Sequence, residues 1–109
     1  MLSVTIRTDL CAQMGVSLCD ITVRSQPGSG LYIAGHILAR QDYRSKPGCV
    51  LQLFADVLDE DDRVLRIAEG EYFGVFEENS FAPFRVFIPG GWLNRAEQVS
   101  LYLLHQREG

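Results

Sequence analysis

The sequence has few of the features that mark metal-binding, nucleic-acid-binding or membrane-spanning chains. Its three cysteines have no Cys-x-x-Cys spacing, so a zinc or redox site of that type is not expected. No apolar run reaches the length of about 18 residues that a membrane-spanning helix needs. The ten Lys and Arg residues are scattered and the net charge is −4, which argues against a nucleic-acid partner.

A further absence concerns helices. No stretch keeps helical periodicity over roughly ten to twelve residues, although Cys11–Met14 could form one helical turn before Gly15 ends it. The chain has 109 residues, of which 47% are apolar, and this is enough to build one core without a disulfide or a metal. We therefore expect a single domain spanning residues 1–109.

The strongest pattern in the sequence is the stretch Val50–Ile67, which predicts two strands joined by a tight turn. The acidic run Asp59–Asp62 interrupts the apolar pattern at the turn, where Asp favours the required backbone conformation. The apolar residues assigned to these two strands are Leu51, Leu53, Ala55, Val57, Phe54 and Leu58 before the turn, and Val64, Leu65 and Ile67 after it.

Other short apolar stretches, separated by turn residues, predict the remaining strands. They lie at Leu2–Thr8, Val16–Arg24, Leu31–Arg40, Glu71–Phe76, Phe84–Ile88 and Gln98–His105. A shift in apolar phase predicts a bulge near Cys19–Asp20, Gly35 indicates a bulge or close backbone approach, and Glu77–Pro83 is expected to be a connector. This pattern favours an all-β fold, an antiparallel β-sandwich of about seven to eight strands.

Three segments carry a resemblance to a known family. They are YIAGHI at Tyr32–Ile37, LFADVLDEDDRVL at Leu53–Leu65 and APFRVFI at Ala82–Ile88, and in them the chain resembles the FxLYD-type and related bacterial immunoglobulin-like domains. Asp62 departs from the family pattern, which has Gly there, and Ser80–Pro83 replaces a Pro-Gly. The resemblance implies an immunoglobulin-like sandwich, and it supplies no catalytic residues.

The acidic turn is the candidate for metal binding, because calcium prefers a set of carboxylate oxygens. Its candidate ligands are Asp59, Asp61 and Asp62. The spacing does not fit the EF-hand pattern, which needs Gly at the sixth loop position and Glu at the twelfth. We therefore expect a solvated turn, and no metal or other cofactor.

Catalysis would need a nucleophile beside a base. The only histidines are His36 and His105, and either could pair with Cys49 or a serine, but no local signature of such a pair is present. Cys11 and Cys19 could form a disulfide only if their strands are neighbours. We expect three reduced cysteines and no enzymatic activity.

An aromatic stretch is the best candidate for a binding surface. A sandwich strand buries one face, whereas the segments from Tyr72 to Phe87 carry apolar residues on both, so some rings are expected at the surface. Trp92 is a further candidate, since Trp is enriched at binding hot spots. The predicted partner-binding residues are Tyr72, Phe73, Phe76, Phe81 and Trp92.

These observations favour a non-enzymatic immunoglobulin-like module that acts through protein–protein contacts, including a homodimer formed by edge pairing or aromatic packing. The alternative is a sandwich that binds a small ligand or carbohydrate, with Trp92, Tyr43 and Tyr72 as stacking residues; a cleft lined by two aromatic rings and convergent carboxylates would favour it. A small hydrolase or metal enzyme ranks third. The chain as written predicts a cytoplasmic protein, or a secreted or periplasmic one if a leader has been removed.

Overall fold

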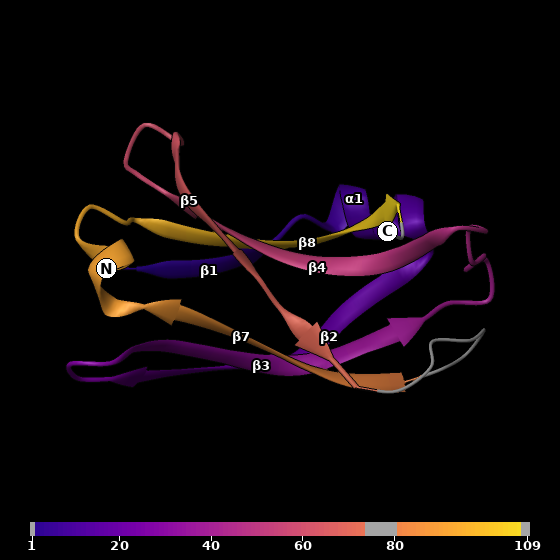
Figure 1. Ribbon diagram of the computed structural model, residues 1–109, viewed down its shortest axis with the longest axis horizontal. Coiled ribbons are helices and arrows are strands. Elements are labelled where there is room, and N and C mark those ends of the chain that lie inside the picture. The colour runs from indigo at the N-terminus through magenta and orange to yellow at the C-terminus, as the bar shows by residue number, and fades with distance from the viewer. Residues whose placement is uncertain (1, 74–80, 108–109) are drawn as a thin grey trace.

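The computed structural model describes residues 2–73 and 81–107, and it consists of two four-stranded sheets packed face to face (Figure 1). The first, called the β4 sheet, has the order β1 (Ser3–Ile6), β8 (Gln98–Arg107), β4 (Cys49–Leu58) and β5 (Val64–Glu69). The second, called the β3 sheet, has the order β2 (Val16–Gln26), β3 (Gly30–Ala39), β7 (Phe81–Pro89) and β6 (Glu71–Tyr72). The predicted all-β sandwich of about eight strands is confirmed.

Pairing is antiparallel throughout the described strands except at one edge. There β1 runs parallel to β8, with Ser3 opposite Gln98 and Ile6 opposite Leu101. The chain leaves β1 through a helix and enters the other sheet, so β1 has no hairpin partner next to it in sequence. A parallel pair of this kind always needs a long connection, and here almost the whole chain provides it.

The helix α1 (Thr8–Met14) is longer than the single turn expected near Cys11. It ends at Gly15, whose φ of 74° is left-handed and whose backbone N–H donates to the carbonyls of Ala12 and Cys11. A helix of seven residues is too short to show a clear periodicity in the sequence. The 3-10 helix η1 (Gly90–Leu93) is shorter still, and no helix among the described residues is long and apolar enough to cross a membrane.

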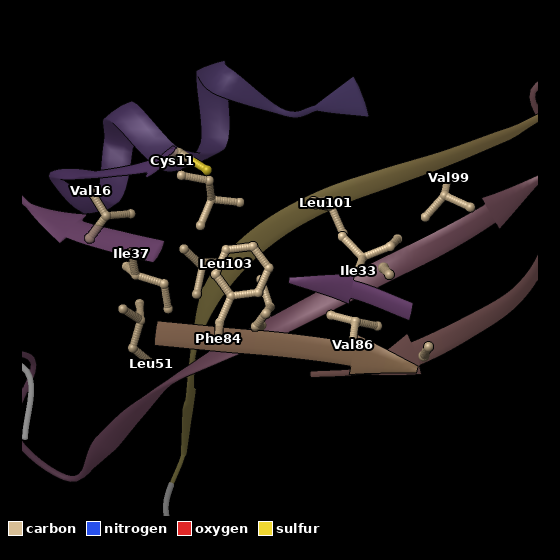
Figure 2. Close-up of a cluster of buried hydrophobic side chains, with 14 of the residues drawn as sticks. Cys11, Val16, Ile33, Ile37, Leu51, Phe84, Val86, Val99, Leu101 and Leu103 are labelled. Carbon is tan, nitrogen blue, oxygen red and sulfur yellow. The ribbon is translucent and has the colours of Figure 1, made fainter. Parts of the chain in front are cut away.

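The core lies between the sheets, where inward-facing side chains from both meet (Figure 2). The predicted alternation in β4 is confirmed, because Leu51, Leu53, Ala55 and Val57 are all buried. The inward row of β7 is buried as predicted too, and its members are Phe84, Val86 and Ile88.

The predicted strand after the acidic turn is confirmed as β5, but it contributes little to the core. Its apolar residues Val64, Leu65 and Ile67 do resume a strand after the turn, but they are 51%, 36% and 53% exposed. Only Ala68 on this strand is buried. The reason is the position of β5, which is the edge strand of its sheet and crosses diagonally toward the other sheet, where the chain continues as β6 (Figure 1).

The bulge and the mid-strand glycine form one feature. The register between β2 and β3 shifts between Cys19 and Thr22, and Asp20 takes a φ of 56° at that point. A Cβ on Gly35 would lie 2.8 Å from the Cys19 carbonyl oxygen and 2.8 Å from the Phe84 ring. Both predictions are confirmed, since the bulged backbone approaches β3 where no side chain fits.

The strand β7 begins earlier than predicted, so residues 81–83 are not part of a connector. Pro83 lies inside this strand, and its carbonyl accepts a 3.0 Å hydrogen bond from the Phe73 backbone N–H. The N–H that proline lacks would therefore point toward the short β6 and not toward β3, so no hydrogen bond to β3 is lost.

Candidate functional site

The outer face of the β3 sheet carries large apolar side chains that no described residue covers. Because Ile33 and Ile37 of β3 point into the core, their sequence neighbours point outward, and the same alternation applies to β7. We call this surface the aromatic face. Its large apolar members and their exposed fractions are Tyr32 (36%), Leu38 (38%), Phe73 (50%), Phe81 (55%) and Phe87 (39%).

Strand register places these side chains in rows across the sheet. Tyr32 lies opposite Phe87, with ring centroids 4.7 Å apart and planes tilted by 45°. Leu38 lies opposite Phe81, and the Phe81 ring also stacks on His36 with centroids 4.4 Å apart. Cross-strand aromatic contacts of this kind hold the rings against the sheet, so the face is an ordered surface and not a set of loose side chains.

A hollow of about 580 Å³ lies beside the row formed by Tyr32 and Phe87. Its cause is the pair formed by Ala34 and Arg85, which lie opposite each other on β3 and β7. Ala34 is small, and the Arg85 guanidinium is drawn away toward β6. There it lies 3.1 Å from a Glu71 carboxylate oxygen and 5.2 Å from the centroid of the Phe73 ring. The hollow is lined by Arg24, Tyr32, Ile33, Ala34, Glu69, Glu71, Arg85, Val86 and Phe87.

The structure brings together two of the five predicted partner-binding residues. Phe73 and Phe81 belong to the aromatic face, whereas Phe76 lies outside the described residues. Tyr72 is half-buried and packs against the core, and Trp92 is half-buried on η1, where it also packs against the core.

Sequence reasoning missed Tyr32 and Leu38 as members of the surface, and it included Phe87 in the partly exposed aromatic stretch but not among the five binding residues. The signal was present, because β3 has apolar residues at consecutive positions, which one buried strand face cannot accommodate. What the sequence did not show is which of the two sets faces the core.

The three residues predicted to stack on a carbohydrate do not share one face. Tyr43 is only 6% exposed, and burial raises the pKa of its hydroxyl. It follows the Ala39 end of β3, whereas η1 with Trp92 contacts Ser29 at the other end, where the Gly90 N–H donates to the Ser29 carbonyl. Instead, the hollow on the aromatic face contains two rings, Tyr32 and Phe87, and two carboxylates, Glu69 and Glu71.

The acidic turn uses its first carboxylate to hold its own backbone. One Asp59 carboxylate oxygen accepts hydrogen bonds from the backbone N–H groups of Asp61, at 2.8 Å, and Arg63, at 3.0 Å. Asp62 takes a left-handed φ of 59° at the turn. Within residues 2–73 and 81–107, no group of three or more ligating side chains could hold a metal ion.

The histidines do not form a nucleophile–base pair with Cys49. His36 lies in the β3 sheet and Cys49 in the β4 sheet, while the buried Nε2 of His105 has no hydrogen-bond partner among the described residues. His36 Nδ1 is instead 3.2 Å from an Asp20 carboxylate oxygen.

Cys19, which lies opposite His36, is also a poor candidate for a nucleophile. Burial, together with the nearby Asp20 carboxylate, raises the pKa of the Cys19 thiol and so disfavours the reactive thiolate. All three cysteines are free, as the sequence predicts, which leaves Cys11 and Cys19 unbridged.

A polar contact on the opposite, β4 face gives a testable pH dependence. The Tyr102 hydroxyl donates a 2.8 Å hydrogen bond to an Asp56 carboxylate oxygen. Burial is the larger cause and the Asp56 carboxylate the smaller cause of a rise in the pKa of Tyr102 from 10.0 to about 12. Since the folded state keeps the proton longer than the unfolded chain, the free energy of unfolding is expected to fall as pH rises from about 10 to about 12. Denaturant unfolding measured across this range checks the fall.

The Tyr102→Phe variant is the control for this pH dependence. It should lose part of the fall above pH 10, and the ultraviolet difference spectrum between the two proteins should show one tyrosine that ionises late. A wild-type and a variant curve of the same shape would contradict the shift.

A comparison of the chain with protein-family models, with curated proteins and with solved structures finds no match in any of the three. The immunoglobulin-like resemblance therefore stays a prediction, and function has to be argued from the aromatic face itself.

Proposed function

We propose that this chain is a non-enzymatic, immunoglobulin-like module that acts through protein–protein contacts made by the aromatic face. One observation carries the proposal: five large apolar side chains lie on one sheet face, each at least 36% exposed, and no described residue covers them. Large apolar patches on a folded monomer mark interaction sites more often than single exposed side chains do.

The size of the aromatic face supports this proposal. A large aromatic side chain buries roughly 150–250 Å², so five side chains with exposed fractions from 36% to 55% present about 400 Å² of apolar surface. One side of a standard protein–protein interface covers about 800 Å², of which a little over half is apolar. The aromatic face thus matches the apolar part of one ordinary interface.

The composition of the face also fits this role. Aromatic residues and arginine are enriched at interfaces, and charged groups are found mainly at the rim. Here Arg85 lies between the rings and is already paired with Glu71, so it brings no unpaired charge to the centre. The β4 sheet differs, because its outer rings Phe54 and Tyr102 stack on each other and are half-buried, and its exposed large apolar residues are all aliphatic. They are Val50 on β4 and Val64, Leu65 and Ile67 on β5.

The hollow favours binding of a small ligand or carbohydrate as a second candidate function, since two rings and two carboxylates line it. A sugar ring needs an aromatic ring with one face free. The Tyr32 and Phe87 rings contact each other at 4.7 Å, which uses part of the surface that stacking would need. A flat protein surface does not have this requirement, so we rank protein contact first.

Comparative affinity capture tests the proposed function. The variant Phe81→Thr/Phe87→Thr removes two exposed rings while keeping residues that favour strands, and Ile67→Thr makes a similar change at a residue 53% exposed on the other sheet. We expect proteins that bind the wild type and Ile67→Thr to be lost from the Phe81→Thr/Phe87→Thr variant. Circular dichroism verifies that all three are folded.

If the double variant captures the same proteins in the same amounts as the wild type, the aromatic face is not the contact surface. Loss of capture by Ile67→Thr to the same extent would assign the contact to β5 instead.

A further inference from the structure

We infer that the occupant of the aromatic face is a second copy of this chain, and that Arg24 of each protomer pairs with Glu69 of its partner across a twofold axis. This inference rests on the proposed function and names the partner of the same surface. It commits to one arrangement, in which two β3 sheets pack face to face.

The first support is the position of two unpaired charges. Arg24 on β2 and Glu69 at the end of β5 both line the hollow, and both are exposed. Within the described parts of the chain, neither side chain has a hydrogen bond or an ion pair, in contrast to Arg85 and Glu71. The cation lies on one flank of the face and the anion on the other, because β2 and β6 are the two edges of the sheet and Glu69, at the end of β5, comes two residues before β6.

The second support is the position of Arg24 and Glu69 relative to the Tyr32–Phe87 pair. Arg24 lies opposite Tyr32, and Tyr32 lies opposite Phe87, so these three form one row across the sheet. Glu69 is the last residue of β5, where it pairs with Phe54 of the β4 sheet, and the chain then enters β6, in which Glu71 lies opposite Arg85. Glu69 lines the hollow together with Arg24, Tyr32 and Phe87, so the unpaired cation and the unpaired anion flank the Tyr32–Phe87 pair from the β2 side and the β6 side.

A twofold axis converts this arrangement into two ion pairs. When two copies pack face to face about an axis parallel to the strands and midway between β3 and β7, each row meets itself with its ends exchanged. Arg24 then faces Glu69 of the other copy, and this contact occurs twice. The same twofold axis places Tyr32 of each copy over Phe87 of the other copy, and Leu38 over Phe81. The exposed apolar residues of the two copies therefore cover one another.

The area and the packing geometry agree with such a dimer. Sheets that pack face to face keep their strands within about 30° of each other, which preserves the rows. About 400 Å² of apolar surface on each copy, with a polar rim, is what one side of a standard interface contains. A face that carries both signs of charge at opposite ends suits its own copy, whereas a face of one sign would repel it.

Charge exchange between Arg24 and Glu69 tests the inference in the full chain. The dissociation constant of the dimer is measured by sedimentation equilibrium over a wide concentration series with reductant present, since the three cysteines are free. We expect R24E alone and E69R alone each to raise this constant by about tenfold or more, because each creates two repulsive pairs. The double variant R24E/E69R should return to within about threefold of the wild type, since it restores both pairs in reverse.

Matched controls separate this effect from net charge. R95E and E60R change the net charge by the same amounts, and both residues are exposed around another pocket, near Asp59. Neither is expected to change the dissociation constant by more than about twofold. The wild type and the five variants are thus compared as six proteins with the same core.

Two results would overturn the inference. A chain that is monomeric at every concentration has no such dimer, and a dimer that weakens equally with R95E or is not restored in the double variant does not contain these pairs. Neither result decides the proposed function, because the capture comparison with Phe81→Thr/Phe87→Thr judges the aromatic face as a surface for other proteins.

Discussion

Replacing Leu53 by alanine is expected to lower the free energy of unfolding by about 2–5 kcal/mol, as measured by chemical denaturation. Leu53 is 0% exposed in the middle of β4, which lies between β8 and β5 in its sheet. Its side chain also comes close to Gly70, where a Cβ would lie 2.5 Å from a Leu53 methyl carbon. Neighbours held this closely cannot collapse into the space that alanine leaves, so a cavity should remain.

Ile67→Ala is the matched control for this prediction. Ile67 is 53% exposed on the neighbouring strand β5, so its truncation removes little buried surface and should change the free energy of unfolding by well under about 1 kcal/mol. If the two variants lost similar stability, the assignment of the inward face of this sheet would be wrong.

Gly15→Ala is expected to lower the free energy of unfolding by at least about 3 kcal/mol. The φ of 74° at this residue alone disfavours a side chain by about 1–2 kcal/mol. A Cβ would also lie 2.6 Å from the Cα and 2.8 Å from the backbone nitrogen of Tyr43. Backbone atoms cannot move aside as the end of a flexible side chain can, so the loop that contains buried Tyr43 must shift.

Gly28→Ala isolates the backbone term. Gly28 has a φ of 77°, close to that of Gly15, but nothing lies within 4 Å of the position that its Cβ would occupy. The free energy of unfolding of the Gly28→Ala variant should be only about 1–2 kcal/mol below that of the wild type. The difference between the two variants, measured by chemical denaturation, is the contribution of the close approach between Gly15 and Tyr43, and equal losses would show that the approach has no effect.

The sequence allowed the sandwich and much of its core to be predicted. Alternation in β4 and β7 identified the inward residues correctly, because both strands are paired on each side and have one face against the other sheet. The bulge at Asp20 and the close approach at Gly35 were predictable for a related reason, since a change of phase and a mid-strand glycine are local signals of a local distortion.

The features that the sequence did not reveal depend on contacts that no local pattern contains. Ile67 looks like a core residue from its neighbours, and only the edge position of β5 explains its exposure. In the same way, the aromatic face combines residues of β3 and β7 that are far apart in sequence, and its hollow exists because Arg85 turns toward Glu71 on a third strand. Only strand order and register reveal such a surface.

The parallel contact of β1 with β8 has a consequence for how the protein is made. Ser3 pairs with Gln98, so the ribosome synthesises nearly all of the described chain after β1 before it makes the partner strand β8. Until then its half-buried residues Val4 and Ile6 have no sheet to join, and pairing strands so distant in sequence is slow. We expect β1 to dock last on a sandwich whose other strands are already paired, so amides of β1 should gain protection from hydrogen exchange later than those of β4 during refolding.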